Sequence, residues 1–176
     1  MVPEAPLERT EEGLQPTGPG WFVVNAREAR WYELPGLGAY VPFEGPDARF
    51  DQLGMNINVL PPGDRGAMYH REPCQEGFLV LAGEPILIVD GQERRLRPWD
   101  YVHLPPDTSH VLVGAGDVPC VYVAVGTRPG GATYPVDAAA LAHDAGVEVE
   151  TSDAAEAYSR FGQGRWRAYR EGDLPG

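Results

Sequence analysis

The sequence predicts an all-β protein with one folded domain. Short runs in which apolar and polar residues alternate recur between residues 52 and 125, and this alternation is typical of strands with one buried face. The 22 glycines and 18 prolines favour many tight turns between such strands. No segment before Pro135 has helical periodicity, and no internal repeat is present. A chain of 176 residues is long enough for one core with appended segments.

The predicted strands follow one another closely. They are expected at 52–60, 76–82, 85–89, around Leu96, and at 101–104, 109–113 and 120–125. Asp90-Gly91 is typical of a two-residue hairpin turn between two of them. Pro61-Pro62-Gly63-Asp64 has the composition of a turn that ends the first.

Composition divides the chain into three parts. Residues 1–20 contain four Glu, one Arg and four Pro and are expected to be disordered. Residues 21–126 are expected to form the β-domain. Residues 127–176 are expected to form a linker and a short helical tail, in which Asp137 can cap a first helix and residues 153–161 form a second.

Leading strands are expected at Trp21–Val24 and around Arg30–Glu33. A small β-domain has exposed sheet edges, which proteins cover or pair, and the Trp and Tyr density of this segment suits an apolar interface. The sequence therefore predicts a homodimer built on these strands.

Charge and residue usage exclude several classes of function. The net charge of −12 argues against a nucleic-acid partner, since phosphate binding requires a basic face. All 14 basic residues are arginines, and the absence of lysine excludes a Schiff-base enzyme and a P-loop. The arginines of the tail, at 160, 165, 167 and 170, are expected to form intramolecular salt bridges rather than a nucleic-acid site.

The sequence also predicts a cytoplasmic location. Cys74 and Cys120 are the only cysteines and form no CxxC pair or disulfide framework, which suits a reducing compartment. The first residues lack the apolar centre of a signal peptide, and no apolar run reaches membrane-spanning length. We therefore expect no membrane association.

Four side chains with metal-binding chemistry lie at spacings that allow them to converge. His70 and Glu72 are two residues apart, so on a strand they share a face. Pro73 bends the chain before Glu76, which opens the next strand, and His110 lies on a later one. Two imidazoles and two carboxylates suit a divalent ion such as Zn, Fe, Mn, Ni or Co.

The spacing of these residues resembles the two motifs of the cupin family. In the first, Gly63 leads His70-x-Glu72, three residues precede Glu76, and six more precede Gly83. In the second, Pro105-Pro106-Asp107 is followed after two residues by His110, with Gly114 where the family usually has Asn. Fifteen residues separate the motifs, from Gly83 to Trp99, as in compact microbial members.

Four departures from the family pattern stand out. Gly63 lies one residue further from His70 than is usual, and Glu72 replaces the second His of the motif. Trp99 and Asp107 replace glycines, although Asp tolerates left-handed backbone better than most residues. The resemblance implies a single-domain cupin, a double-stranded β-helix or jelly-roll barrel similar to the RmlC-like members, with His70, Glu72, Glu76 and His110 as metal ligands.

Three functions remain open under this resemblance. The first is a metal-dependent enzyme of oxygenase, isomerase or lyase type that acts on a small polar molecule in the barrel. The second is a metal-free sugar-type isomerase or epimerase with His70 or His110 as general base. The third is a non-catalytic domain that binds a small molecule.

Individual side chains also keep alternative interpretations. Glu72 can instead point outward to Arg71 or Arg65. Cys74 is a thiolate ligand or, more simply, a small buried side chain, and His103 is a pocket residue or an ordinary surface histidine. Polar residues that can line the pocket are Tyr69, Asn56, Asn58, Tyr101 and Tyr122.

Overall fold

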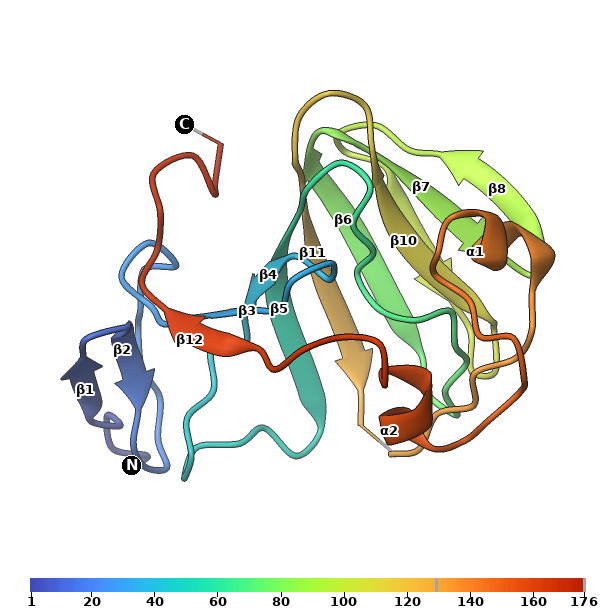
Figure 1. The fold of residues 1–176 in the computed structure, drawn as a ribbon. Coiled ribbons are helices and arrows are strands. Elements are labelled where there is room, and N and C mark those ends of the chain that lie inside the picture. Colours follow the sequence, from blue (N-terminus) through green and yellow to red (C-terminus); the bar gives the residue numbers. More distant parts are fainter. Residues whose placement is uncertain (129, 176) are drawn as a thin grey trace.

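The computed structural model describes residues 1–128 and 130–175 and confirms the all-β prediction (Figure 1). A seven-stranded antiparallel sheet has the order β12-β3-β4-β5-β11-β6-β9, and a three-stranded sheet has the order β10-β7-β8. The strands are β1 (Leu7–Thr10), β2 (Gly13–Pro16), β3 (Trp31–Glu33), β4 (Ala39–Val41), β5 (Leu53–Leu60), β6 (Glu76–Ala82), β7 (Glu84–Val89), β8 (Gln92–Arg95), β9 (Tyr101–Leu104), β10 (His110–Ala115), β11 (Cys120–Thr127) and β12 (Arg165–Arg167). The helices are α1 (Ala138–Ala142) and α2 (Ala154–Ala157).

The main core lies between the two sheets. Phe78 and Leu104 of the larger sheet pack with Leu87 and Leu112 of the smaller one in a single buried cluster. Full burial of each such side chain contributes roughly 1.5–3 kcal/mol. Strand β11 is central, because it pairs with β5 on one side and with β6 on the other. This arrangement leaves the candidate site at one end of the barrel, where β6 and β10 both begin.

Turn chemistry explains how the strands are joined. Asp90 and Gly91 have φ angles of 43° and 72°, and they connect β7 to β8, which confirms the predicted hairpin. Trp99 and Asp107, which stand where the family motif has glycine, also have positive φ angles of 76° and 63°. The backbone therefore keeps the left-handed turns that glycine normally supplies, although such a φ angle is unfavourable for a residue as bulky as Trp99.

The first residues differ from the prediction. Where the sequence predicts disorder, β1 and β2 form a hairpin, and Gln15 and Ala5 are buried. Its strands are short and polar, so their stability comes from packing on the rest of the chain, which local composition does not reveal. The predicted strand at Trp21–Val24 is also wrong, because this segment makes only an isolated bridge from Trp21.

The predicted strand around Arg30–Glu33 is β3, and it pairs within the chain to β4 and to β12. Trp31 is fully buried there, in a cluster with Val41 and Val59 on the outer face of the large sheet. Both edges of β3 are thus occupied, and this strand is not free to pair with a second copy.

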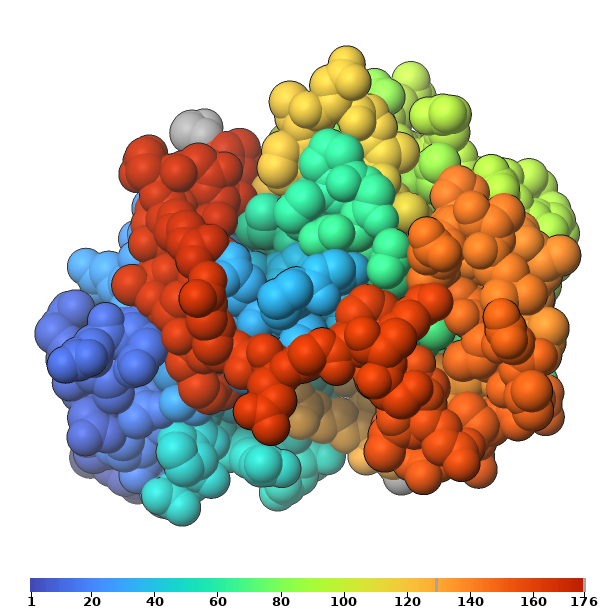
Figure 2. Space-filling model, in the orientation of Figure 1, coloured from blue at the N-terminus to red at the C-terminus, as the bar shows by residue number. Residues whose placement is uncertain are grey.

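The tail is only partly helical. Asp137 caps α1 by accepting a hydrogen bond from the Ala140 amide at 2.9 Å, as predicted. The tail then continues through α2 to β12, a strand that the sequence did not predict, and Figure 2 shows it lying across the outside of the barrel. Among the described residues, no helix has the length and apolar character needed to cross a membrane.

Candidate metal centre

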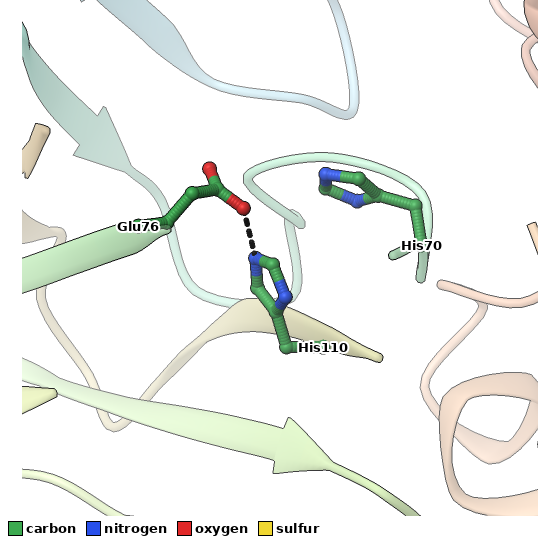
Figure 3. A group of neighbouring side chains, drawn as sticks. All are labelled: His70, Glu76 and His110. Carbon is green, nitrogen blue, oxygen red and sulfur yellow. Dashed lines mark ion pairs between the residues drawn. The ribbon is translucent and has the colours of Figure 1, made fainter. Parts of the chain in front are cut away.

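Three of the four predicted ligands meet at one end of the barrel. One donor atom each of His70, Glu76 and His110 lie within 4.8 Å of one another, and Figure 3 shows their side chains pointing toward a common space. Glu76 is the first residue of β6 and His110 the first of β10. His70 lies outside any named strand, in a segment that runs beside β10.

Backbone hydrogen bonds place His70 against His110. The His70 amide donates to the His110 carbonyl at 3.1 Å, and the His110 amide donates to the His70 carbonyl at 2.8 Å. The predicted shared face of His70 and Glu72 assumed an extended run, but His70 and Arg71 make isolated bridges to different partners, His110 and Thr133. The chain therefore crosses between two partners here, which an alternating pattern does not predict.

Both imidazoles are oriented by the backbone. His70 Nδ1 lies 2.7 Å from the carbonyl of Met68, and His110 Nδ1 lies 2.9 Å from the carbonyl of Thr108. A carbonyl oxygen only accepts, so each Nδ1 carries the proton and each Nε2 presents a lone pair. Metal-binding histidines are typically held in this way.

The lone pair of His110 faces another electron donor. His110 Nε2 lies 3.2 Å from Glu76 Oε2 and is a buried atom without a hydrogen-bond partner. Burial by itself raises the pKa of Glu76, but the close approach of His110 and His70 outweighs it, so the pKa of Glu76 lies below its ordinary value. An ionised carboxylate and an imidazole lone pair require a cation between them, either a proton or a metal ion. Two ligand atoms that each lie about 2.1 Å from one ion are separated from each other by a distance similar to that between His110 Nε2 and Glu76 Oε2.

Glu72 faces the same space but joins a different group. Its Oε1 lies 3.8 Å from His70 Nε2, and its Oε2 accepts a hydrogen bond from Cys74 Sγ at 3.1 Å. Glu72, Cys74 and Glu76 form a second group of possible ligands. The alternative in which Glu72 points outward to Arg71 or Arg65 is therefore not what the structure shows.

A cavity of about 500 Å³ lies beside these residues. Of the polar residues proposed from the sequence, Asn56, Asn58 and Tyr122 line it. Three further tyrosines that the sequence did not indicate, Tyr40, Tyr134 and Tyr158, also line it. The last two come from the tail, far along the chain, so no local signal could have placed them there.

The remaining predicted pocket residues lie elsewhere. His103 and Tyr101 are exposed on β9, and Tyr69 is buried in a separate cluster between the small sheet and α1. His143 contacts Glu93 at 3.0 Å on the surface. The simpler interpretation of His103 as a surface histidine is thus confirmed.

Cys74 behaves as a protonated thiol. Burial, the hydrogen bond to Glu72 and the nearby carboxylates raise its pKa to about 12, and burial raises the pKa of Cys120 to about 12. Both side chains are buried. We expect neither cysteine to react with iodoacetamide at pH 8 in the folded protein, whereas both react in denaturant, because the thiolate is the reactive form. Rapid native labelling of Cys74, followed by mass spectrometry, would contradict this assignment.

This barrel with a His/Glu cluster at its end has the architecture that the resemblance to cupins implied, and the comparison with known families agrees with that resemblance. Residues 56–126 match the family model of the cupin domain, and the motif residues from Glu72 to His110 lie within this segment. The chain therefore contains a cupin domain in this segment.

Individual relatives are distant or match only in part. The chain is 40% identical over 50 residues to quercetin 2,3-dioxygenase of Bacillus subtilis, a stretch that is 28% of this chain and 15% of that protein. It is 23% identical over 61 residues to an uncharacterised protein of Methanocaldococcus jannaschii, which is 35% of this chain and 49% of that protein. The chain thus matches no more than about half the length of these relatives. A solved structure described as a sugar phosphate isomerase of the cupin superfamily, from Silicibacter pomeroyi, superimposes with a TM-score of 0.50 at 25% identity, over 58% of this chain and 73% of that one.

Proposed function

We propose that His70, Glu76 and His110, with Glu72 as a fourth and weaker ligand, hold a divalent metal ion, and that the cavity beside it is the active site of a metal-dependent enzyme. The observation that carries the proposal is the orientation of both imidazoles, whose Nε2 lone pairs converge with an ionised carboxylate. Buried imidazole and carboxylate groups normally have a bonding partner.

The metal would act as a Lewis acid toward a small polar molecule in the cavity. The residues of the chain have separate tasks. The two histidines, whose rings are held by backbone carbonyls, would hold the ion. The Tyr and Asn side chains of the cavity wall would orient the bound molecule. The partial similarity to a quercetin dioxygenase supports oxygenase chemistry, and the superposition with a protein described as a sugar phosphate isomerase supports isomerase chemistry.

A metal-free isomerase is the second candidate. The 3.2 Å separation of His110 Nε2 and Glu76 Oε2 also suits a shared proton, and such a pair can act as a general acid and base. Elemental analysis of protein purified without a His-tag separates the two candidates. About one equivalent of a divalent metal supports the first, and metal-free protein that still converts substrate supports the second.

Glu72 is expected to matter less for metal binding than the histidines. Its Oε1 lies 3.8 Å from His70 Nε2, and water can replace a carboxylate ligand. We therefore expect Glu72→Gln to retain the ion with a metal affinity lowered by about tenfold. This loss is at the lower end of the range of about 10–100-fold that follows the removal of a contact orienting a metal ligand. Metal titration of the folded variant measures this. A loss of binding as complete as that of a histidine variant would place Glu72 among the principal ligands.

We also propose that the protein is a cytoplasmic homodimer. Because β3 is paired on both edges within the chain, the contact would use the exposed side chains before it, including Trp21 and Val23, which are 53% and 79% exposed. Light scattering is expected to give twice the mass of one chain, and Trp21→Ser is expected to shift the protein toward monomer. A wild-type monomer at micromolar concentration would contradict the dimer.

A further inference from the structure

The cavity beside the candidate metal centre has acidic side chains and lacks a strongly basic one. Among the described residues that line it, Glu72 and Glu76 are carboxylates and none is an arginine, and the chain contains no lysine. The two carboxylates therefore cancel the charge of a divalent ion, and without an ion they leave the cavity negative.

The arginines of the tail do not supply the missing positive charge. The tail lines the cavity with Tyr134 and Tyr158, but three of its arginines, at positions 165, 167 and 170, are bound to Glu33. The fourth, Arg160, donates to the carbonyl of Asp144. An anion in the cavity would lose its hydration without gaining a guanidinium partner.

The hydrogen-bonding groups of the wall are neutral instead. Tyr40, Asn58 and Tyr122 are cross-strand neighbours on β4, β5 and β11, and all three line the cavity. Burial raises the pKa of Tyr122 and raises that of Tyr158 to about 12, so these hydroxyls keep their protons. Neutral amides and hydroxyls recognise hydroxyl and carbonyl oxygens.

We propose that this cavity binds an uncharged molecule that carries hydroxyl or carbonyl oxygens and excludes molecules with a phosphate or carboxylate group. The inference rests on the proposed function in that it concerns the same site and takes the ion as bound. The exclusion of anions does not need the ion, because the metal-free cavity is more negative still.

Matched probes that differ by one charged group test the proposal. The pairs are xylose with xylose 5-phosphate, and 4-hydroxybenzaldehyde with 4-hydroxybenzoate. Binding to the metal-loaded protein is measured by saturation-transfer NMR and calorimetry, and metal content is measured on the same samples. We expect the neutral member of at least one pair to bind about tenfold or more tightly than its anionic partner.

A charge variant tests the cause of the selectivity. Glu72→Gln removes one negative charge from the cavity wall, so we expect it to narrow the preference for the neutral member by about tenfold. Glu84→Gln is the matched control, because it changes the net charge equally but lies exposed on β7, outside the cavity lining. The control is expected to keep the wild-type ratio.

Each outcome bears on the proposal. An anionic member that binds as tightly as its neutral partner would overturn it, and so would the absence of binding by both members of both pairs. A Glu72→Gln variant with the same ratio as wild type would overturn the electrostatic cause. Protein that prefers the neutral members while containing no metal would leave this inference standing and would refute the proposed metal site alone.

Discussion

His70→Ala and His110→Ala are each expected to abolish stable metal binding. The two histidines supply the only imidazole nitrogens in the cluster, and their orientation is fixed by the backbone carbonyls of Met68 and Thr108. Weakening such an orienting contact costs about 10–100-fold in metal affinity, so loss of the ligand itself should cost more than about 100-fold. Elemental analysis of purified variants and titration of stripped protein both measure the change.

The chain provides matched controls of the same residue type. It contains four histidines, and the other two, His103 and His143, lie on the surface away from the cavity. His103→Ala and His143→Ala are expected to bind metal as wild type does. Melting curves of all four metal-free variants verify that each is folded. Full occupancy in both His70→Ala and His110→Ala would refute the site.

The candidate site could be predicted because its residues follow a local spacing rule. Glu76 opens a strand whose bounds were predicted correctly, and the turn at Asp107 brings the chain to His110. The convergence of His70 with His110 needed more than alternation, because two backbone hydrogen bonds between distant segments create it. The family resemblance supplied that long-range information, which periodicity alone does not contain.

The parts that were missed depend on contacts between segments far apart in sequence. Strand β12 exists because it pairs with β3, more than 130 residues earlier, and it has only three residues. The β1–β2 hairpin is polar and becomes ordered against Ala29 and its neighbours. Tyr134 and Tyr158 reach the cavity only after the tail has crossed the barrel. Short segments of this kind lack the length that makes a local pattern decisive.

Arg167→Ala is expected to destabilise the protein by about 2–4 kcal/mol, because it breaks a largely buried ion-pair network. The Arg167 side chain is 9% exposed and lies 3.3 Å from Glu33 and 2.7 Å from Asp173. Its guanidinium also lies 5.6 Å from the ring centre of the buried Trp31. The variant leaves Asp173 without this partner and weakens the attachment of β12. Urea unfolding of the full chain measures the resulting loss in the free energy of unfolding.

Arg165→Ala is the matched control for this prediction. Arg165 binds the same carboxylate of Glu33 at 2.9 Å but is 71% exposed, so its removal is expected to cost less than about 1 kcal/mol. Burial by itself raises the pKa of Glu33. Its hydrogen bonds to Arg165 and Arg170 and the charge of Arg167 lower this pKa by a larger amount, so the net shift is downward. A carboxylate with a lowered pKa stabilises the fold above its unfolded-state pKa and loses that contribution as the pH falls through the folded-state value. The gap between wild type and Arg167→Ala should therefore narrow at acidic pH. Two results would contradict the assignment of the stabilisation to the buried pair. One is a loss of stability in Arg165→Ala as large as that in Arg167→Ala. The other is a stability difference between wild type and Arg167→Ala that widens at acidic pH.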